Sequence, residues 1–117
     1  MNDTAGLVYD DDAAVLFAMK LTGLDERLVR RVLRSKDRYL LGMGIMPSDG
    51  ADALGATPEE LREGNPSLFP QGNVDQRYVS EPLQHAFIVR DSSVNEQTVA
   101  AILQADDEYM RRRGIID

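Results

Sequence analysis

Residues 24–46 read LDERLVRRVLRSKDRYLLGMGIM, and residues 94–116 read VNEQTVAAILQADDEYMRRRGII. Aligned without a gap at an offset of 70 residues, the two stretches are identical at seven of 23 positions. The identical pairs are Glu26/Glu96, Val29/Val99, Leu33/Leu103, Asp37/Asp107, Tyr39/Tyr109, Gly44/Gly114 and Ile45/Ile115. Any two amphipathic helices share some apolar positions, but these stretches also share a cap region, a tyrosine and a closing Gly-Ile. We therefore predict that the chain contains a duplicated two-helix unit.

Each stretch contains a long helix, and a shorter helix is expected before it, near residues 11–21 and 81–90. Asp25 and Asn95 stand where the N-cap of each long helix belongs. In the first stretch the apolar residues recur at spacings of three and four, as one buried helix face requires. These residues are Leu28, Val29, Val32, Leu33, Tyr39, Leu40 and Met43. The predicted fold is all-α, with two helix-turn-helix-like pairs at about 11–46 and 81–116.

The connection between the two pairs, residues 47–79, is rich in Gly, Pro, Asn, Asp and Ser and is expected to be mostly loop. Within it, Thr57-Pro58-Glu59-Glu60 forms a capping box, which predicts a short helix that Gly64 closes. The stretch NPSLFPQGN (residues 65–73) is expected to be irregular. We expect Leu68 and Phe69 to bury against the helices and hold the connection in place.

The length and composition favour one folded domain spanning residues 1–117. Hydrophobic residues make up 43% of the 117 and charged residues 28%, which is typical of a soluble globular protein. The absence of cysteine excludes disulfides, thiolate nucleophiles and Cys-ligated zinc. No apolar run approaches the roughly 18 residues of a membrane span, and the first residues, MNDTAGLVYDDD, are acidic. We therefore expect a cytoplasmic protein that does not enter a membrane.

Positive charge is concentrated in one part of this acidic chain, whose formal net charge is -7. Between residues 20 and 39 there are seven Lys or Arg against three Asp or Glu, while the other 97 residues carry six against 17. Arg27, Arg30, Arg31 and Arg34 share one face of the first long helix. Arginine suits bidentate contacts with phosphates and guanine edges. The other interpretation is a solvated face, or arginines that pair with acidic residues elsewhere in the chain.

The segment GLDERLVRRVL, which begins at Gly23, resembles the turn and recognition helix of repressor-type helix-turn-helix regulators. The positions that match the family pattern are Gly23, Leu24, Asp25, Val29, Val32 and Leu33, whereas Met19 stands where the family has a small residue. The resemblance covers about 20 residues and implies a non-enzymatic DNA-binding regulatory protein. The DNA-binding residues would be Lys20, Arg27, Arg30, Arg31, Arg34, Lys36 and Arg38.

The second long helix carries small or neutral groups at the positions equivalent to the four arginines. These residues, Gln97, Ala100, Ala101 and Gln104, suit contact with another helix, a partner protein or the second subunit of a homodimer. A competing hypothesis is an acidic interaction module, an inhibitor or adaptor that docks on a basic surface of a partner protein. The net charge favours this alternative, and the arginines favour DNA.

No pattern in the sequence indicates an enzyme, a cofactor or a metal site. Asp10-Asp11-Asp12 lacks the glycine and the closing glutamate of a calcium loop. His85 is the one histidine of the chain, so two imidazole ligands are excluded. Tyr39 and Tyr109 occupy matching positions, which indicates a repeated packing contact with a bonded hydroxyl.

Overall fold

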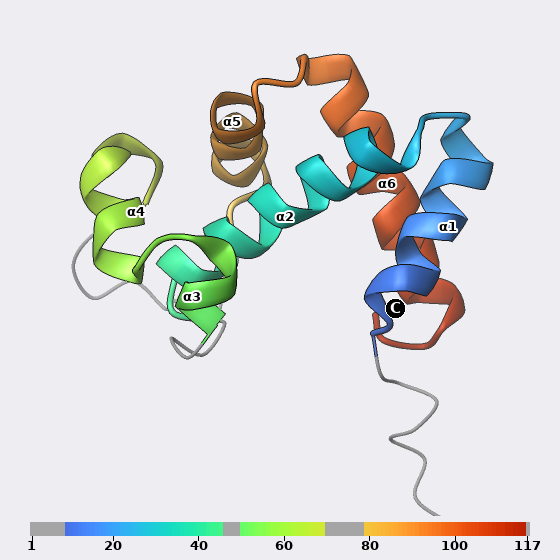
Figure 1. Cartoon of the computed structure of the whole chain (residues 1–117), viewed down its shortest axis with the longest axis horizontal. Helices are drawn as coiled ribbons and strands as arrows, with labels where there is room; N and C mark the ends of the chain where they lie inside the picture. Colours follow the sequence, from blue (N-terminus) through green and yellow to red (C-terminus); the bar gives the residue numbers. More distant parts are fainter. Residues whose placement is uncertain (1–8, 46–49, 70–78, 117) are drawn as a thin grey trace, which may run out of the picture.

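The computed structural model describes residues 9–45, 50–69 and 79–116, and this part of the chain consists of helices and turns without a strand (Figure 1). The predicted all-α fold is confirmed. The helices are α1 (Asp11–Thr22), α2 (Glu26–Gly42), α3 (Ala51–Leu54), α4 (Pro58–Gly64), a 3₁₀ turn (Pro66–Leu68), α5 (Glu81–Ser92) and α6 (Glu96–Arg112).

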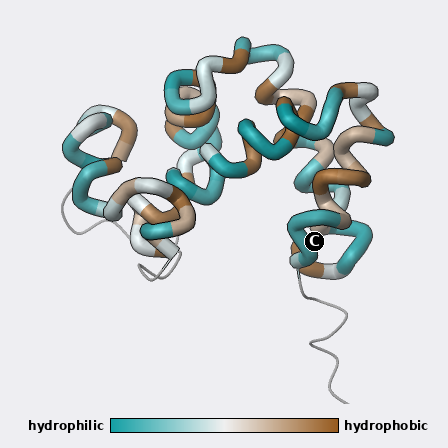
Figure 2. The backbone as a smooth tube through the Cα atoms, viewed as in Figure 1, coloured by the Kyte–Doolittle hydropathy of each residue, from teal (hydrophilic) through white to brown (hydrophobic). Residues whose placement is uncertain are grey.

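The two long helices and the two shorter helices before them form most of the structure. α1 packs mainly on α6, and α2 packs mainly on α5, so the main partner of each helix is distant in the sequence. α2 also contacts the small helices α3 and α4, which Figure 1 shows around its C-terminal end. Figure 2 shows α2 as mostly hydrophilic with separate hydrophobic segments along it, as its amphipathic sequence predicts.

The long helices begin at the predicted caps. The Asp25 carboxylate accepts a hydrogen bond of 2.8 Å from the Leu28 N–H, and the Asn95 side chain accepts one of 2.8 Å from Thr98. Both preceding helices end in a left-handed residue, at Gly23 (φ 77°) and at Ser93 (φ 61°). The first helices extend slightly beyond the predicted ends, to residues 22 and 92.

Both long helices end in the same hydrogen-bond pattern. In α2 the Ile45 N–H donates to the Leu40 carbonyl and the Gly44 N–H donates to Leu41, and α6 ends likewise at Gly114 and Ile115. The two glycines have φ values of 80° and 75°, as the C′ residue of this pattern requires. The helix bounds of the second pair equal those of the first pair plus 70 residues.

The core is aliphatic around a cluster of three aromatic rings, Tyr39, Phe69 and Phe87. Most of the predicted α2 stripe is buried, whereas Leu28 and Leu40 are half-buried. Ser35 and Leu41 are also buried, although the helical pattern of the sequence did not predict it.

The connection between the pairs is more regular than expected where the structure describes it. The predicted capping box at Thr57 and Glu60 forms and opens α4, which ends at Gly64 as expected. The short helix α3 and the 3₁₀ turn replace segments that we expected to be loop or irregular. Phe69 is buried, which confirms the expected anchoring at this residue, whereas Leu68, which was also expected to be buried, is only half-buried against the core. The parts of the expected loop at 46–49 and 70–78 lie outside the described residues.

Two properties of the described residues concern membranes and metals. None of the described helices has the length and apolar character needed to cross a membrane. Within the described ranges, no three His, Cys, Asp or Glu side chains are grouped so that they could hold a metal ion.

Candidate nucleic-acid interface

The N-terminal half of α2 presents four arginines to solvent. Arg27, Arg30, Arg31 and Arg34 are exposed, while Val29, Val32 and Leu33 hold the opposite side of the helix against the core. The three- and four-residue spacing of the arginines brings them to one side, because an α-helix turns once every 3.6 residues.

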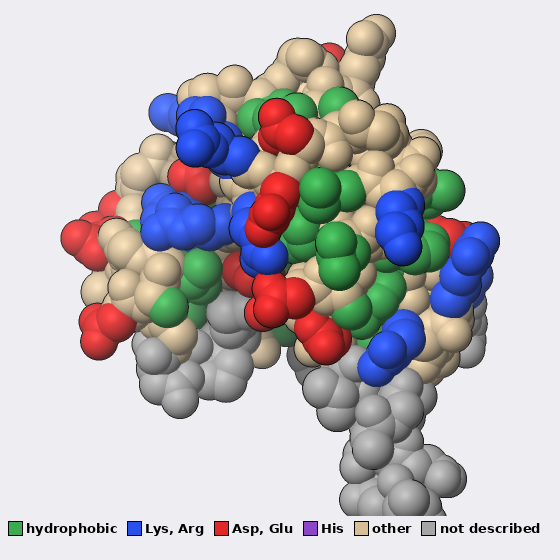
Figure 3. All heavy atoms as spheres, turned by 45° about the vertical axis from the view of Figure 1, so that its right-hand side comes forward, with side chains coloured by type: hydrophobic (Ala, Val, Ile, Leu, Met, Phe, Trp, Pro, Cys, Tyr) green, Lys and Arg blue, Asp and Glu red, His purple; other side chains and the backbone are tan. Residues whose placement is uncertain are grey.

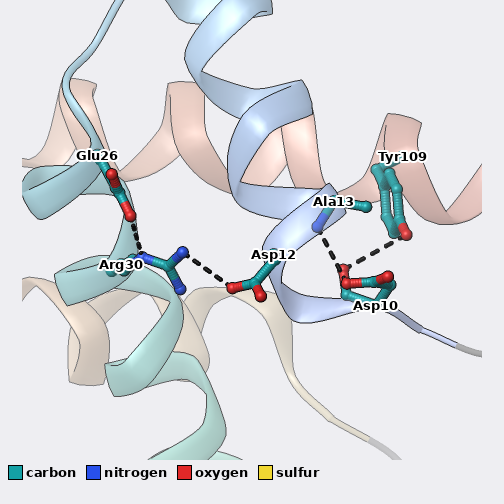
Figure 4. Close-up of polar contacts among 6 residues, drawn as sticks. All are labelled: Asp10, Asp12, Ala13, Glu26, Arg30 and Tyr109. Carbon is teal, nitrogen blue, oxygen red and sulfur yellow. Dashed lines mark hydrogen bonds and ion pairs between the residues drawn. The ribbon is translucent and has the colours of Figure 1, made fainter.

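Arg30 is held by two carboxylates from different helices (Figure 4). Its Nε lies 2.7 Å from Glu26 Oε2, and its Nη2 lies 2.9 Å from Asp12 Oδ1 on α1. Hydrogen bonding to Glu26, and then to Asp12, raises the pKa of the guanidinium. The Glu26 contact follows from i,i+4 spacing. The Asp12 contact was not visible in the sequence, because it depends on how α1 crosses α2.

Arg27, Arg31 and Arg34, which we call the arginine face, have no ion pair within the described part of the chain. Lys20 near the end of α1 is likewise exposed and without an ion pair there. The tip of Arg34 reaches the end of α3, since its Nη2 is 3.2 Å from where a Cβ on Gly55 would stand. The charge of the arginine face is therefore available to an external anion.

Lys36 and Arg38, which the sequence grouped with these arginines, have partners inside the protein. Lys36 Nζ lies 2.6 Å from Oδ2 of Asp106, a residue only 1% exposed. Arg38 Nε lies 3.0 Å from Asp91 Oδ2, and its Nη1 also donates to the Leu54 carbonyl. These two cations neutralise buried or half-buried carboxylates and fix the packing between helices.

The predicted contact residues on α6 line two different hollows. Gln97, Ala101 and Gln104 line a groove of 390 Å³ together with Leu21 and Leu24. Ala100 is half-buried and lines a separate cavity of 220 Å³, which Gln104 also borders. The 390 Å³ groove has no charged side chain among the described residues of its lining.

Several acidic groups lie around the pair of Lys36 and Asp106. Tyr9 donates a hydrogen bond to Asp106 Oδ1, and burial is the main cause that raises the pKa of this tyrosine. Burial, with the nearby charge of Asp11, raises the pKa of Asp37 to about 6. Burial also raises the pKa of Asp107. The sequence did not single out these residues, because their desolvation arises only when α2 and α6 meet.

The two repeated tyrosines make structural contacts. The Tyr39 hydroxyl donates to the Leu68 carbonyl at 2.8 Å, and the Tyr109 hydroxyl donates to the Asp10 carbonyl at 3.4 Å. His85 is half-buried in α5 and borders the 220 Å³ cavity.

Charges of both signs share the surface. Figure 3 shows Lys and Arg side chains in separate groups, with a band of acidic side chains between them in this view.

Comparison of the chain with protein-family models, curated proteins and solved structures finds no match. Function is therefore inferred from the side chains themselves.

Proposed function

We propose that the chain is a small, non-enzymatic DNA-binding regulatory protein that contacts the phosphate backbone through the arginine face. The observation that carries the proposal is the exposure of three arginines on one side of α2 without an ion pair in the described part of the chain. The other three cations of this helix, Arg30, Arg38 and Lys36, are already neutralised by the carboxylates of Asp12, Asp91 and Asp106.

The turn before α2 supports the same proposal. Three residues, Gly23 to Asp25, separate α1 from α2, and the left-handed Gly23 and the capping Asp25 occupy the places that the resemblance to helix-turn-helix regulators gives them. A recognition helix contacts DNA through the residues of its N-terminal part, which is where Arg27 and Arg31 lie. The acidic remainder of the chain repels a duplex outside this contact zone, and so confines binding to the arginine face.

The test is fluorescence polarisation of a labelled random duplex of about 20 base pairs, a length that exceeds one helical turn. The variant replaces Arg27, Arg31 and Arg34 with Gln. Its control replaces Arg90, Arg111 and Arg112 with Gln, which removes the same formal charge from α5 and α6 although Arg111 and Arg112 pair with Glu108. We expect the first variant to weaken binding and to reduce the slope of its salt dependence by up to about 0.9 for each phosphate that is no longer neutralised. The control should bind nearly as well as the natural sequence.

Circular dichroism melting separates a binding defect from unfolding, because the arginine face makes no buried contact that the substitutions would remove. An equal decrease in affinity in both triple variants would contradict a defined interface and would indicate a response to net charge alone. If the natural sequence shows no affinity for duplex at low salt, where the electrostatic contribution is largest, DNA binding is wrong. The acidic interaction module, which the net charge of -7 favours, would then be the proposal to test against a basic peptide.

A further inference from the structure

The two helix pairs contact each other reciprocally. α1 of the first pair packs on α6 of the second, and α2 packs on α5. The rings of Tyr39 and Phe87 lie 5.3 Å apart at 50°, and those of Phe17 and Tyr109 lie 6.0 Å apart at 53°. Phe17 and Phe87 are equivalent at the 70-residue offset, and so are Tyr39 and Tyr109. The same Tyr–Phe contact therefore occurs twice, once with the tyrosine from the first helix pair and once with the tyrosine from the second. Two subunits related by a two-fold axis touch in this way.

The position of such an axis is marked by one charged pair. In a two-fold arrangement, a residue touches its own equivalent only where the axis passes. Lys36 and Asp106 are equivalent at the 70-residue offset, and their side chains meet at 2.6 Å. The axis therefore passes between these two side chains.

The surroundings of this pair are also repeated. A cavity of 210 Å³ on one side of Lys36 is lined by Asp11, Leu33 and Asp37. A cavity of 220 Å³, also bordered by Lys36, is lined by the three equivalent residues, Glu81, Leu103 and Asp107. In each cavity the acid on the long helix lies near the acid at the start of the short helix. Burial is the main cause that raises the pKa of Asp37 and of Asp107, and the charge of this neighbouring acid adds to it.

We infer that the two helix pairs associate as the two subunits of a two-fold dimer do. The ion pair between Lys36 and Asp106 makes the first helix pair associate with the second helix pair and not with another copy of itself. Two copies of the first pair would bring Lys36 against Lys36 at a site where the Lys36 side chain is only 16% exposed. Two copies of the second pair would bring Asp106 against Asp106. Like charges in a desolvated contact repel strongly. The partner that each inner surface fits is thus a helix pair with the opposite charge on the axis, from this chain or from a second copy.

A local contact favours the carboxylate on α6 and the lysine on α2. Tyr9 donates to Asp106, whereas the residue equivalent to Tyr9 is Val79, which has no side-chain donor. The carboxylate is therefore better stabilised on α6 than on α2. This inference rests on the packing between the pairs and is independent of DNA binding.

Charge exchange in the full chain tests the inference. K36D and D106K each place like charges on the axis, and both should melt at a clearly lower temperature than the natural sequence. The exchange variant K36D/D106K should regain most of the lost stability, while D52K, a reversal at an exposed site on α3, should change little. An exchange variant no more stable than the weaker of its two parents would overturn the selective role of the pair.

Mixing the two single variants tests the interchange of partners. We expect K36D and D106K, refolded together in equal amounts, to form a two-chain complex that neither forms alone. In this complex the aspartate introduced at position 36 meets the lysine introduced at position 106, and the natural Lys36 meets the natural Asp106. Light scattering after size exclusion measures the mass, and the melting temperature should rise above those of the separate variants. A mixture that behaves as the sum of its components would overturn the inference that the inner surfaces are interchangeable.

Discussion

Phe69 gives the sharpest test of how the connection between the helix pairs stabilises the fold. Its ring stacks on Tyr39 with centroids 4.8 Å apart and lies edge-on to Phe87 at 5.5 Å. The residue is 4% exposed, so F69A removes a buried ring and leaves a cavity in the core. Phe→Ala changes in cores cost about 3–5 kcal/mol, and the removal of two ring–ring interactions favours the upper half of that range. We expect F69A to lower the free energy of unfolding by about 4 kcal/mol.

A substitution at Gly42 tests how closely the Phe69 ring approaches α2. A Cβ on Gly42 would lie 2.5 Å from Phe69 Cε1 and 2.7 Å from Cζ, so G42A overpacks the natural core. Overpacking costs about 1–3 kcal/mol, which the better helix propensity of alanine offsets by up to about 1 kcal/mol. When F69A removes the ring, the new methyl group occupies part of the vacated space. The double variant should therefore be destabilised by at least about 1 kcal/mol less than the sum of the two single effects.

Urea unfolding followed by circular dichroism gives the free energies of this cycle, provided that the dependence on urea is the same for all four proteins. L68A is the matched control, because Leu68 is adjacent in sequence but only half-buried. The L68A variant should therefore lose less stability than F69A. Additive effects of F69A and G42A would refute the close approach of ring and helix. A destabilisation below about 1 kcal/mol for F69A would refute the anchoring itself.

Two further predictions concern single residues. The pKa of Asp37 is raised from 3.8 to about 6, so the folded state binds the proton more tightly and this group's contribution to stability falls as pH rises between those values. D37N should therefore raise the free energy of unfolding at pH 7 by about 1 kcal/mol after allowance for solvent screening, and by much less near pH 4. Urea titrations at both pH values measure this difference, and equal gains would contradict it. At the two turns, G23A should be destabilised by about 1 kcal/mol because φ is 77°, and S93G should gain stability because Ser93 holds φ at 61°; thermal melts that shift in the same direction would exclude backbone strain as the cause.

Helices α2, α4 and α6 and their capping residues were predictable because the forces that set a helix start act within a few residues, whereas α3 and the 3₁₀ turn were not predicted. Asp25, Asn95 and Thr57 cap helices through bonds to residues three positions away, and the sequence displays that spacing directly. The burial of Phe69 was also predictable, since a large apolar side chain in a polar stretch has few other places to go.

The candidate interface was only partly predictable, since the partners of its cations are distant in the sequence. The local concentration of positive charge groups Lys36 and Arg38 with the arginines, but Asp106 and Asp91 reach them only after α5 and α6 have packed. The burial of Ser35 has the same origin, because its hydroxyl donates to Asp91 at 2.8 Å. Charge patterns identify a basic helix, and tertiary contacts decide which of its charges remain available.

The reciprocal packing of the pairs also constrains how the chain folds during synthesis. Because α1 rests mainly on α6, the inner face of the first helix stays uncovered until α6 has left the ribosome. Synthesis proceeds at about 5–20 residues per second, so the 90 residues between Thr22 and Arg112 take several seconds, during which that face has no partner helix. The nascent first pair thus resembles an unpaired subunit, open to chaperones and to neighbouring chains on the same message.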